Sequence, residues 1–319
     1  MSESLAARSG HGWLPWIAFA AISLIWGSTW LAHKWALADF TPVGLLTVRF
    51  LMAAVACFAL GRIRRESFPD RAQLKPILLA GLILTGIANV ATAWSLTHIP
   101  SGVGAVLQAP IPVWMALFSL RTDPLSKTGW LAAVLGLVGV ALVSIPENSG
   151  SDFSVLPSLV CIFAAASWSW ASLYQRKHVN SGGLLTNASL QMLQGGLLGL
   201  LMLGLGFPAT THGSFSSVSP AAWYAVAYLV VFGSCIAFAA YLYLTKVWHP
   251  ARAGSFSYLN PVVAVGLGAW IGGEPLSWRV AIGLAVILLA VGVLQYATIR
   301  GARRDAKRLL DTAAGEPGN

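Results

Sequence analysis

A small set of polar side chains interrupts long apolar runs in this sequence, and these residues could do chemistry inside them. Arg49 is the one fixed charge well inside a run. Amides occur in other runs, at Asn89, Gln108, Gln191, Gln194 and Asn260. An arginine can pair with a carboxylate, and an amide offers both donors and acceptors. These types suit binding of a polar or zwitterionic solute; the alternative is a structural role, with Arg49 on backbone carbonyls and the amides joining helices.

Aromatic side chains accompany the polar ones. Trp26, Trp30 and His33 are spaced i, i+4 and i+7, which places them on one face of a helix. Further rings in other runs are Trp94, Trp168 and Tyr241. Together they could form an aromatic wall that accepts the apolar part of a solute or stacks on a cation, and ordinary packing is the alternative. Protons are an open partner, through His33 or His98.

No arrangement typical of an enzyme is found. The apolar runs contain no Asp or Glu, and neither a nucleophile-elbow motif nor a Gly-rich phosphate loop is present. Cys57, Cys161 and Cys235 lie far apart inside apolar runs, which is typical of small buried hydrophobic residues and not of a metal site. We therefore expect no catalytic residue, no metal and no cofactor, and both an ATP-driven pump and a membrane-embedded enzyme are disfavoured.

The elements that must position these residues are membrane helices. The chain is 56% hydrophobic and 10% charged, whereas a soluble domain is about 25% charged. A helix needs roughly 20 apolar residues to cross a bilayer. Ten runs meet this length: 14–37, 42–60, 76–97, 101–120, 128–145, 154–175, 184–205, 221–244, 251–272 and 278–298. The sequence predicts an all-α integral membrane protein with ten transmembrane helices, the first of which is retained.

Two of the runs share one design. Pro110 and Pro261 stand 151 positions apart, and so do Asp123 and Glu274, each of which begins an acidic-Pro-Leu-Ser ending. A proline removes a backbone donor and displaces the carbonyl four residues earlier. Broken segments at corresponding places in two halves point to a transport site. We therefore expect helix breaks, with a gating role, at Pro110 and Pro261.

The duplication extends to other runs. Trp168 follows Trp26 by 142 positions, and Gly233 follows Gly86 by 147. Each half holds five predicted helices, and an odd number inverts the second copy in the membrane. The predicted organisation is a tail at 1–13, a first five-helix repeat at 14–146, a second inverted repeat at 147–299, and a basic tail at 300–319.

The net charge of +9 is placed by topology. Most of the 20 Lys and Arg fall in alternate loops and in the C-terminal tail. Positive charge collects on the cytoplasmic side of membrane proteins, which predicts that both termini are cytoplasmic. Anionic lipid headgroups, and not nucleic acid, are the expected partners of this charge.

Six blocks resemble one known family: 26–37 (WGSTWLAHKWAL), Pro42 through Phe50, 101–107 (SGVGAVL), 167–174 (SWSWASLY), 232–244, and 257–277 with NPV and GGEPLS. They are similar to EamA-type transporters of the drug/metabolite transporter superfamily, and the resemblance covers nearly the whole chain. It implies two five-helix repeats and export of amino acids or related metabolites across the cytoplasmic (inner) membrane.

The sequence thus predicts a secondary transporter that exports a small amphipathic metabolite by alternating access. The predicted substrate-binding residues are Trp26, Trp30, Arg49, Asn89, Trp94, Gln108, Trp168, Tyr241 and Asn260. Export of lipophilic drugs is the second hypothesis. The amides and Arg49 favour a metabolite, and the 14 tryptophans favour a lipophilic cation.

Overall fold

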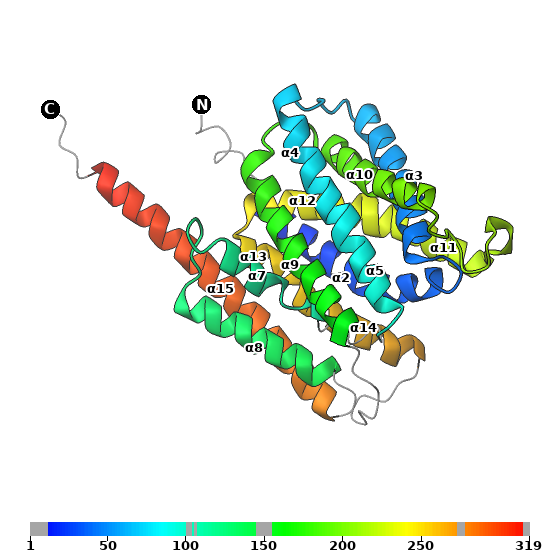
Figure 1. The fold of residues 1–319 in the computed structure, drawn as a ribbon. Coiled ribbons are helices and arrows are strands. Elements are labelled where there is room, and N and C mark those ends of the chain that lie inside the picture. The colour runs from blue at the N-terminus through cyan, green and yellow to red at the C-terminus, as the bar shows by residue number, and fades with distance from the viewer. Residues whose placement is uncertain (1–11, 100–103, 105–106, 145–154, 273–277, 315–319) are drawn as a thin grey trace.

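The computed structural model describes residues 12–99, 104, 107–144, 155–272 and 278–314, and these are helical apart from short loops and one isolated β-bridge (Figure 1). The helices of the first half are α2 (Leu14–Ala36), α3 (Pro42–Ile63), α4 (Arg71–Gly81) continued by η1 (Leu82–Ile87) and α5 (Ala88–Leu96), α7 (Ile111–Phe118) and α8 (Lys127–Ser144). Those of the second half are α9 (Val155–His178), α10 (Leu184–Gly204), α11 (Pro220–Tyr228) continued by η3 (Leu229–Ile236) and α12 (Ala237–Val247), α13 (Pro250–Gly254) with α14 (Phe256–Gly272), and α15 (Trp278–Ala314), and a short turn, η2 (Phe215–Ser217), precedes α11.

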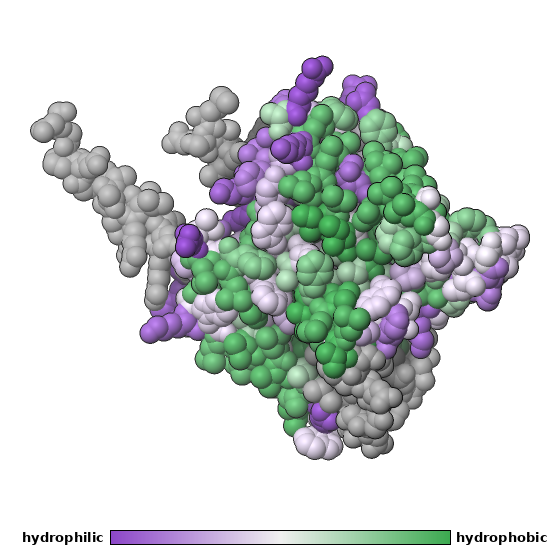
Figure 2. Space-filling model, viewed as in Figure 1, coloured by the Kyte–Doolittle hydropathy of each residue, from purple (hydrophilic) through white to green (hydrophobic). Residues whose placement is uncertain are grey.

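In the described residues these elements account for ten membrane helices in two inverted five-helix repeats, as predicted. Six helical segments are long and apolar enough to cross a bilayer. Large apolar side chains cover the outside of the bundle, and Figure 2 shows a broad hydrophobic face with polar groups gathered mainly at its edges. Such a surface needs a lipid environment.

The packing of the helices follows the internal duplication. Helix α3 packs along its counterpart α10, and α8 packs along its counterpart α15 (Figure 1). Helix α2 of the first repeat packs on α12 and α14 of the second, while α9 packs on α5 and α7 of the first. Each contact thus has a partner related by exchange of the repeats, as a pseudo-twofold axis requires.

Backbone hydrogen bonds between loops repeat in the same way. The amide of Thr41 donates to the carbonyl of Ala209 (3.1 Å), and the amide of Gly183 donates to the carbonyl of Ser67 (2.9 Å). Thr41 and Gly183 are 142 positions apart, and so are Ser67 and Ala209. One bond joins the start of α3 to the segment after α10, and the other joins the start of α10 to the segment after α3. The two repeats are thus tied together at both ends of the α3–α10 pair.

Two π-helical segments occupy corresponding positions. Segment η1 interrupts the third helix of the first repeat, and η3 interrupts the third helix of the second. A π-helical turn leaves a carbonyl outside the regular bonding pattern, and such turns are frequent at functional sites. Asn89 Nδ2 donates to Leu84 O (2.7 Å), and Trp26 Nε1 donates to Gly233 O (2.9 Å). Side chains thus bind carbonyls within both segments.

The two prolines do not behave alike. A turn at Ala109–Pro110 precedes α7, so a break lies where the sequence predicts one. The expected break at Pro261 is not found, because α14 runs through Pro261 without interruption. A proline leaves a backbone carbonyl of its helix without a donor, and neighbouring groups in a helix bundle can hydrogen-bond that carbonyl instead. The break lies six residues earlier, at Ser255, whose hydroxyl donates to Arg252 O (2.8 Å) and accepts from Gln295 Nε2 (3.1 Å).

Some expectations fall outside the described residues. These are the acidic-Pro-Leu-Ser ending at 274–277, the repeat boundary at 146–147, and most of the N-terminal tail. The C-terminal tail is described to Ala314 as a continuation of α15, which leaves the bundle as one straight helix (Figure 1).

Candidate functional site

A central cavity of about 110 Å³ lies between the two repeats and is partly open to solvent. Helices α2, α3, α5, α9, α10, α12 and α14 and both π-helical segments contribute to its wall. Its lining side chains include Trp26, Thr29, Trp30, His33, Arg49, Thr85, Asn89, Thr92, Leu96, Gln108, Trp168, Met192, Ser234, Phe238, Phe256 and Asn260. The wall is mostly apolar with a few convergent polar groups, which is typical of a small-molecule site.

Seven of the nine predicted binding residues line this cavity: Trp26, Trp30, Arg49, Asn89, Gln108, Trp168 and Asn260. Two do not. Trp94 packs on His98, with ring centroids 4.5 Å apart. Tyr241 is fully buried behind Trp168, whose Nε1 donates to its hydroxyl (3.0 Å).

Arg49 reaches the cavity from α3 and is held on two sides. Its Nε donates to Ser234 Oγ (2.9 Å), and its Nη1 donates to His33 Nε2 (3.0 Å). His33 Nδ1 lies 2.8 Å from the carbonyl of Thr29, so Nδ1 carries the hydrogen and Nε2 is the acceptor. The histidine is therefore neutral in this arrangement.

No carboxylate of the described residues pairs with Arg49. A guanidinium inside a span is costly unless an anion or a dense set of carbonyls compensates it. Neither bond described above is to a carbonyl, because Ser234 and His33 are neutral side-chain acceptors. The site can therefore accept a solute carboxylate without displacing an internal ion pair.

The three predicted amides differ in how much of their bonding capacity is used. Gln108 Nε2 donates to Thr92 Oγ1 (2.6 Å), and Asn89 Nδ2 donates to the carbonyl of Leu84 in η1 (2.7 Å). Asn260 is 7% exposed, and its Oδ1 is buried without a hydrogen-bond partner among the described residues. An unpaired buried acceptor costs about 1–3 kcal/mol. A donor group on a bound solute would remove that cost.

One end of the cavity is floored by aromatic rings. The ring of Trp26 lies 5.5 Å from that of Trp168, 5.2 Å from that of Tyr241 and 4.9 Å from that of Phe256. Tyr241 also holds Ser172, whose Oγ lies 2.5 Å from its hydroxyl. The floor combines residues of both repeats, so it forms only when the repeats are together.

Beyond the floor, a polar network joins the ends of several helices. Arg176 lies 3.7 Å from the carboxylate of Asp123 and donates to the carbonyl of Trp248. Arg252 stacks on Trp248, with its guanidinium carbon 3.6 Å from the ring centroid. His249 Nε2 lies 3.1 Å from the carbonyl of Asp123. This basic network combines residues of both repeats.

Ser234, Phe238 and Phe256 also line the cavity, and the residue types alone did not indicate them. Ser234 follows Gly233, which corresponds to Gly86 in the first repeat. That correspondence marks η3, but it does not reveal that the chain turns the serine toward Arg49. Among the described residues no three His, Cys, Asp or Glu side chains are grouped closely enough to hold a metal ion.

An inverted pair of five-helix repeats around a central cavity defines a membrane transporter fold. The model of the EamA-like transporter family matches residues 13–145 and 156–296, and the chain belongs to this family. It is thus a multi-pass membrane protein of the drug/metabolite transporter superfamily.

Similar proteins agree with this assignment. The chain is 33% identical over 278 residues to the Uncharacterized inner membrane transporter YedA of Escherichia coli (strain K12), covering 86% of this chain and 88% of the relative. It is 24% identical over 290 residues to Protein PecM of Dickeya dadantii (strain 3937), covering 89% and 93%. A solved structure described as "Crystal structure of protein" matches with a TM-score of 0.74 at 22% identity, covering 89% of this chain and 97% of that chain.

Proposed function

We propose that this protein is a secondary transporter that exports a small amphipathic metabolite, an amino acid or a related compound, across the cytoplasmic membrane by alternating access. The observation that supports this most is Arg49. It is buried at the cavity wall, two neutral acceptors orient it, and no carboxylate of the described residues neutralises it. A carboxylate on the solute supplies the missing charge.

The rest of the wall fits the other parts of such a solute. The unpaired Oδ1 of Asn260 accepts from a donor such as an ammonium group. The rings of Trp26, Trp168 and Phe256 cover an apolar side chain and also favour a nearby cation. A fixed cation, a free acceptor and aromatic rings in the wall of one cavity suit a zwitterion.

The side of the membrane that the cavity faces follows from its position along the helices. Trp30, His33 and Leu96 line it near the ends of α2 and α5, and the aromatic floor separates it from the basic network around Arg176. With both termini and the basic loops in the cytoplasm, the cavity faces outward and the closed end faces inward.

Uptake of a labelled amino-acid pool into proteoliposomes, with and without a pH gradient, tests this function. We expect saturable uptake that one amino-acid class competes away, and loss of most of that uptake in Arg49→Gln. The amount of folded protein, measured by gel filtration, should be similar in the variant. Equal loss of folded protein and uptake would make Arg49 structural, and no uptake by folded wild-type protein would refute the substrate class.

A lipophilic cation is the second candidate, and the tryptophan-rich wall favours it. The guanidinium of Arg49 opposes it, because like charges repel in a medium of low dielectric constant. Tetraphenylphosphonium offered to the same vesicles separates the two. If it is transported, Arg49→Gln should increase its uptake, whereas the same change should decrease amino-acid uptake.

A further inference from the structure

A second, much smaller cavity of about 10 Å³ lies between α9, α10 and α12, and we call it the inner cavity. Its lining residues include Gln175, Asn187, Gln191, Leu242 and Thr245, with Arg176 and Lys246 also in the wall. In this conformation it has room for about one water molecule. It is too narrow for a metabolite.

Three amide side chains in the wall of the inner cavity are buried, and each has one polar atom without a hydrogen-bond partner among the described residues, although Asn187 Nδ2 donates to the carbonyl of Ser181 (3.0 Å). Gln175 is 4% exposed, Asn187 3% and Gln191 1%. Gln175 Nε2, Asn187 Oδ1 and Gln191 Oε1 have no hydrogen-bond partner among the described residues. Each unpaired group costs about 1–3 kcal/mol. One donor and two acceptors left unused in one small cavity indicate a ligand that this conformation does not admit.

The inner cavity continues the central cavity along the same three helices. On α10, Met192 lines the central cavity and the adjacent Gln191 lines the inner one. On α12, Phe238 lines the central cavity, and Leu242, one helical turn further on, lines the inner one. Thr85, which lines the central cavity, donates to the backbone carbonyl of Gln191 (2.6 Å). The two cavities thus have neighbouring residues of α10 and α12 in their walls.

The internal duplication relates the two cavities. Gln175 lies 142 positions after His33, and Gln191 lies 142 positions after Arg49. Trp26 and Trp168, as well as the hydrogen-bonded positions Thr41 and Gly183, share this offset. The open cavity therefore holds the His33–Arg49 pair of one repeat, and the narrow cavity holds the corresponding Gln175–Gln191 pair of the other.

We propose that Gln175, Asn187 and Gln191 form a second binding site for the transported solute, which opens toward the basic loops when the central cavity closes on the opposite side. This inference deepens the proposed function, since it rests on alternating access. When inverted repeats exchange conformations, Gln175 and Gln191 take on the environment that His33 and Arg49 have in this structure. The orphaned amide atoms then bind the solute.

The two sites differ in charge. In the first repeat the pair supplies a guanidinium, whereas in the second it supplies two neutral amides. Cations at the inner cavity, Arg176 and Lys246, stand at the ends of their helices. The Gln175–Gln191 pair therefore offers the solute hydrogen bonds and no charge of its own, whereas the corresponding pair of the first repeat offers the guanidinium of Arg49.

Thiol accessibility tests the inner site without a known solute. Gln191→Cys and Gln175→Cys are each reconstituted in vesicles of known orientation and treated with a hydrophilic methanethiosulfonate reagent from either side. We expect both variants to react from the side of the basic loops, at rates at least about tenfold above wild type. Wild-type protein is the control, because Cys57, Cys161 and Cys235 are all buried. Thr92→Cys in the central cavity should react from the opposite side.

Labelling of both inner variants at the wild-type rate, or only from the opposite side, would overturn the inner site. A second variant tests binding: Gln191→Leu should raise the KM for amino-acid uptake several-fold from the side of the basic loops and change it less from the other side. An equal change from both sides would also count against the site. If labelling is sided but folded wild-type vesicles take up no amino acid, the site stands and the proposed substrate class fails.

Discussion

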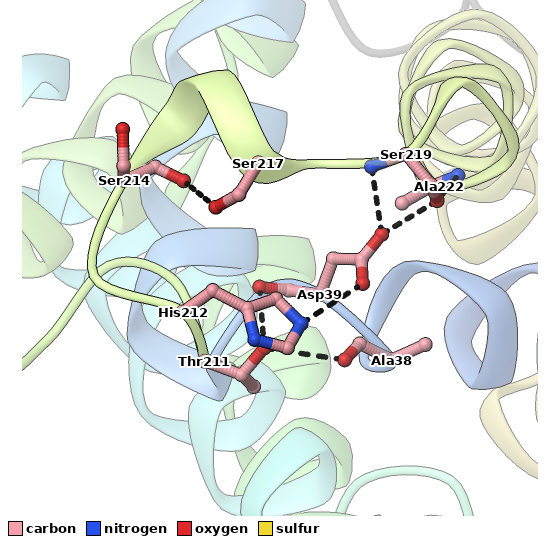
Figure 3. A network of polar contacts seen from close by, with 8 residues as sticks. All are labelled: Ala38, Asp39, Thr211, His212, Ser214, Ser217, Ser219 and Ala222. Atoms are coloured by element: carbon pink, nitrogen blue, oxygen red, sulfur yellow. Dashed lines mark hydrogen bonds and ion pairs between the residues drawn. The ribbon is translucent and has the colours of Figure 1, made fainter.

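Asp39 Oδ2 accepts two hydrogen bonds from Ser219, one from the backbone amide (2.9 Å) and one from the hydroxyl (2.5 Å) (Figure 3). Asp39 follows α2 in the first repeat, and Ser219 caps the start of α11 in the second. His212 Nε2 lies 3.6 Å from the other carboxylate oxygen. In the inverted counterpart, the amide of Asp70, which precedes α4, donates to Ser181 Oγ (3.1 Å). Acid and serine have exchanged places between the two loops.

The Asp39 contacts predict a dependence of stability on pH. The hydroxyl and amide of Ser219, helped by His212, lower the pKa of Asp39 below its ordinary value. The stabilisation is therefore present above the unfolded pKa of about 3.9, and it is lost as the pH falls through the lower folded pKa. At pH 7 the Tm of Asp39→Asn in detergent should lie a few degrees below wild type, and the gap should narrow in acid. A gap of constant size would show that the charge is not involved.

Ser234 orients Arg49, which gives a prediction about affinity. A hydrogen bond to a charged group contributes about 1.5–3 kcal/mol, so Ser234→Ala should raise the KM for a carboxylate solute roughly tenfold with a smaller change in kcat. Thr298→Ala is a matched control, because its hydroxyl bonds only within α15 and lies away from the cavity. Initial uptake rates over a range of solute concentrations check this. An equal effect in both variants would contradict it.

A substitution of Asn260 should lower transport without lowering stability. Asn260→Leu removes the unpaired Oδ1, which costs about 1–3 kcal/mol when buried, and keeps the branching of the side chain. We expect the Tm to stay the same or rise, while uptake of a solute with an ammonium or hydroxyl donor falls at least about fivefold. A fall in both would show that Asn260 is part of the framework and not of the binding wall.

Gly44 lies where α3 passes the α10–α11 loop. A Cβ placed there would stand 1.7 Å from the carbonyl oxygen of Ala209, whose backbone is held by Thr41. Gly44→Ala should therefore destabilise the protein by about 3 kcal/mol or more. At Gly204, on the end of α10, a Cβ meets nothing within 4 Å, so Gly204→Ala should change stability by less than about 1 kcal/mol. Comparing the Tm of the two variants with that of wild type tests the close approach at Gly44.

The number of helices and their duplication could be predicted from the sequence, because bilayer thickness sets the length of an apolar run. The helix breaks could be predicted only in part. Pro110 lies at a turn, but α14 continues through Pro261, and the turn falls at Ser255 instead. A tertiary contact lies at this turn, because Gln295 of α15 donates to the hydroxyl of Ser255, and no local pattern contains that contact.

The binding wall was predictable where residue type is unusual for a membrane span, as for Arg49 and Asn260. It was less predictable for rings, because tryptophans are common in this chain. Trp26 and Trp168 line the cavity, yet Trp94 packs on His98 outside it. Whether a side chain faces the cavity depends on how its helix is rotated about its own axis. The π-helical segments η1 and η3 shift that rotation part-way along a helix, so the 3.6-residue period alone does not give it.

Helix α15 has a mechanical consequence. It is one helix of 37 residues, which at 1.5 Å per residue extends about 55 Å, while the hydrocarbon core is about 30 Å thick. About 25 Å of rigid rod therefore projects beyond the bilayer, continuous with the part that packs along α8. A tilt of about 10° of this rod displaces its free end by roughly 4 Å. Small tilts of the last membrane helix would therefore move the end of this rod by several ångströms.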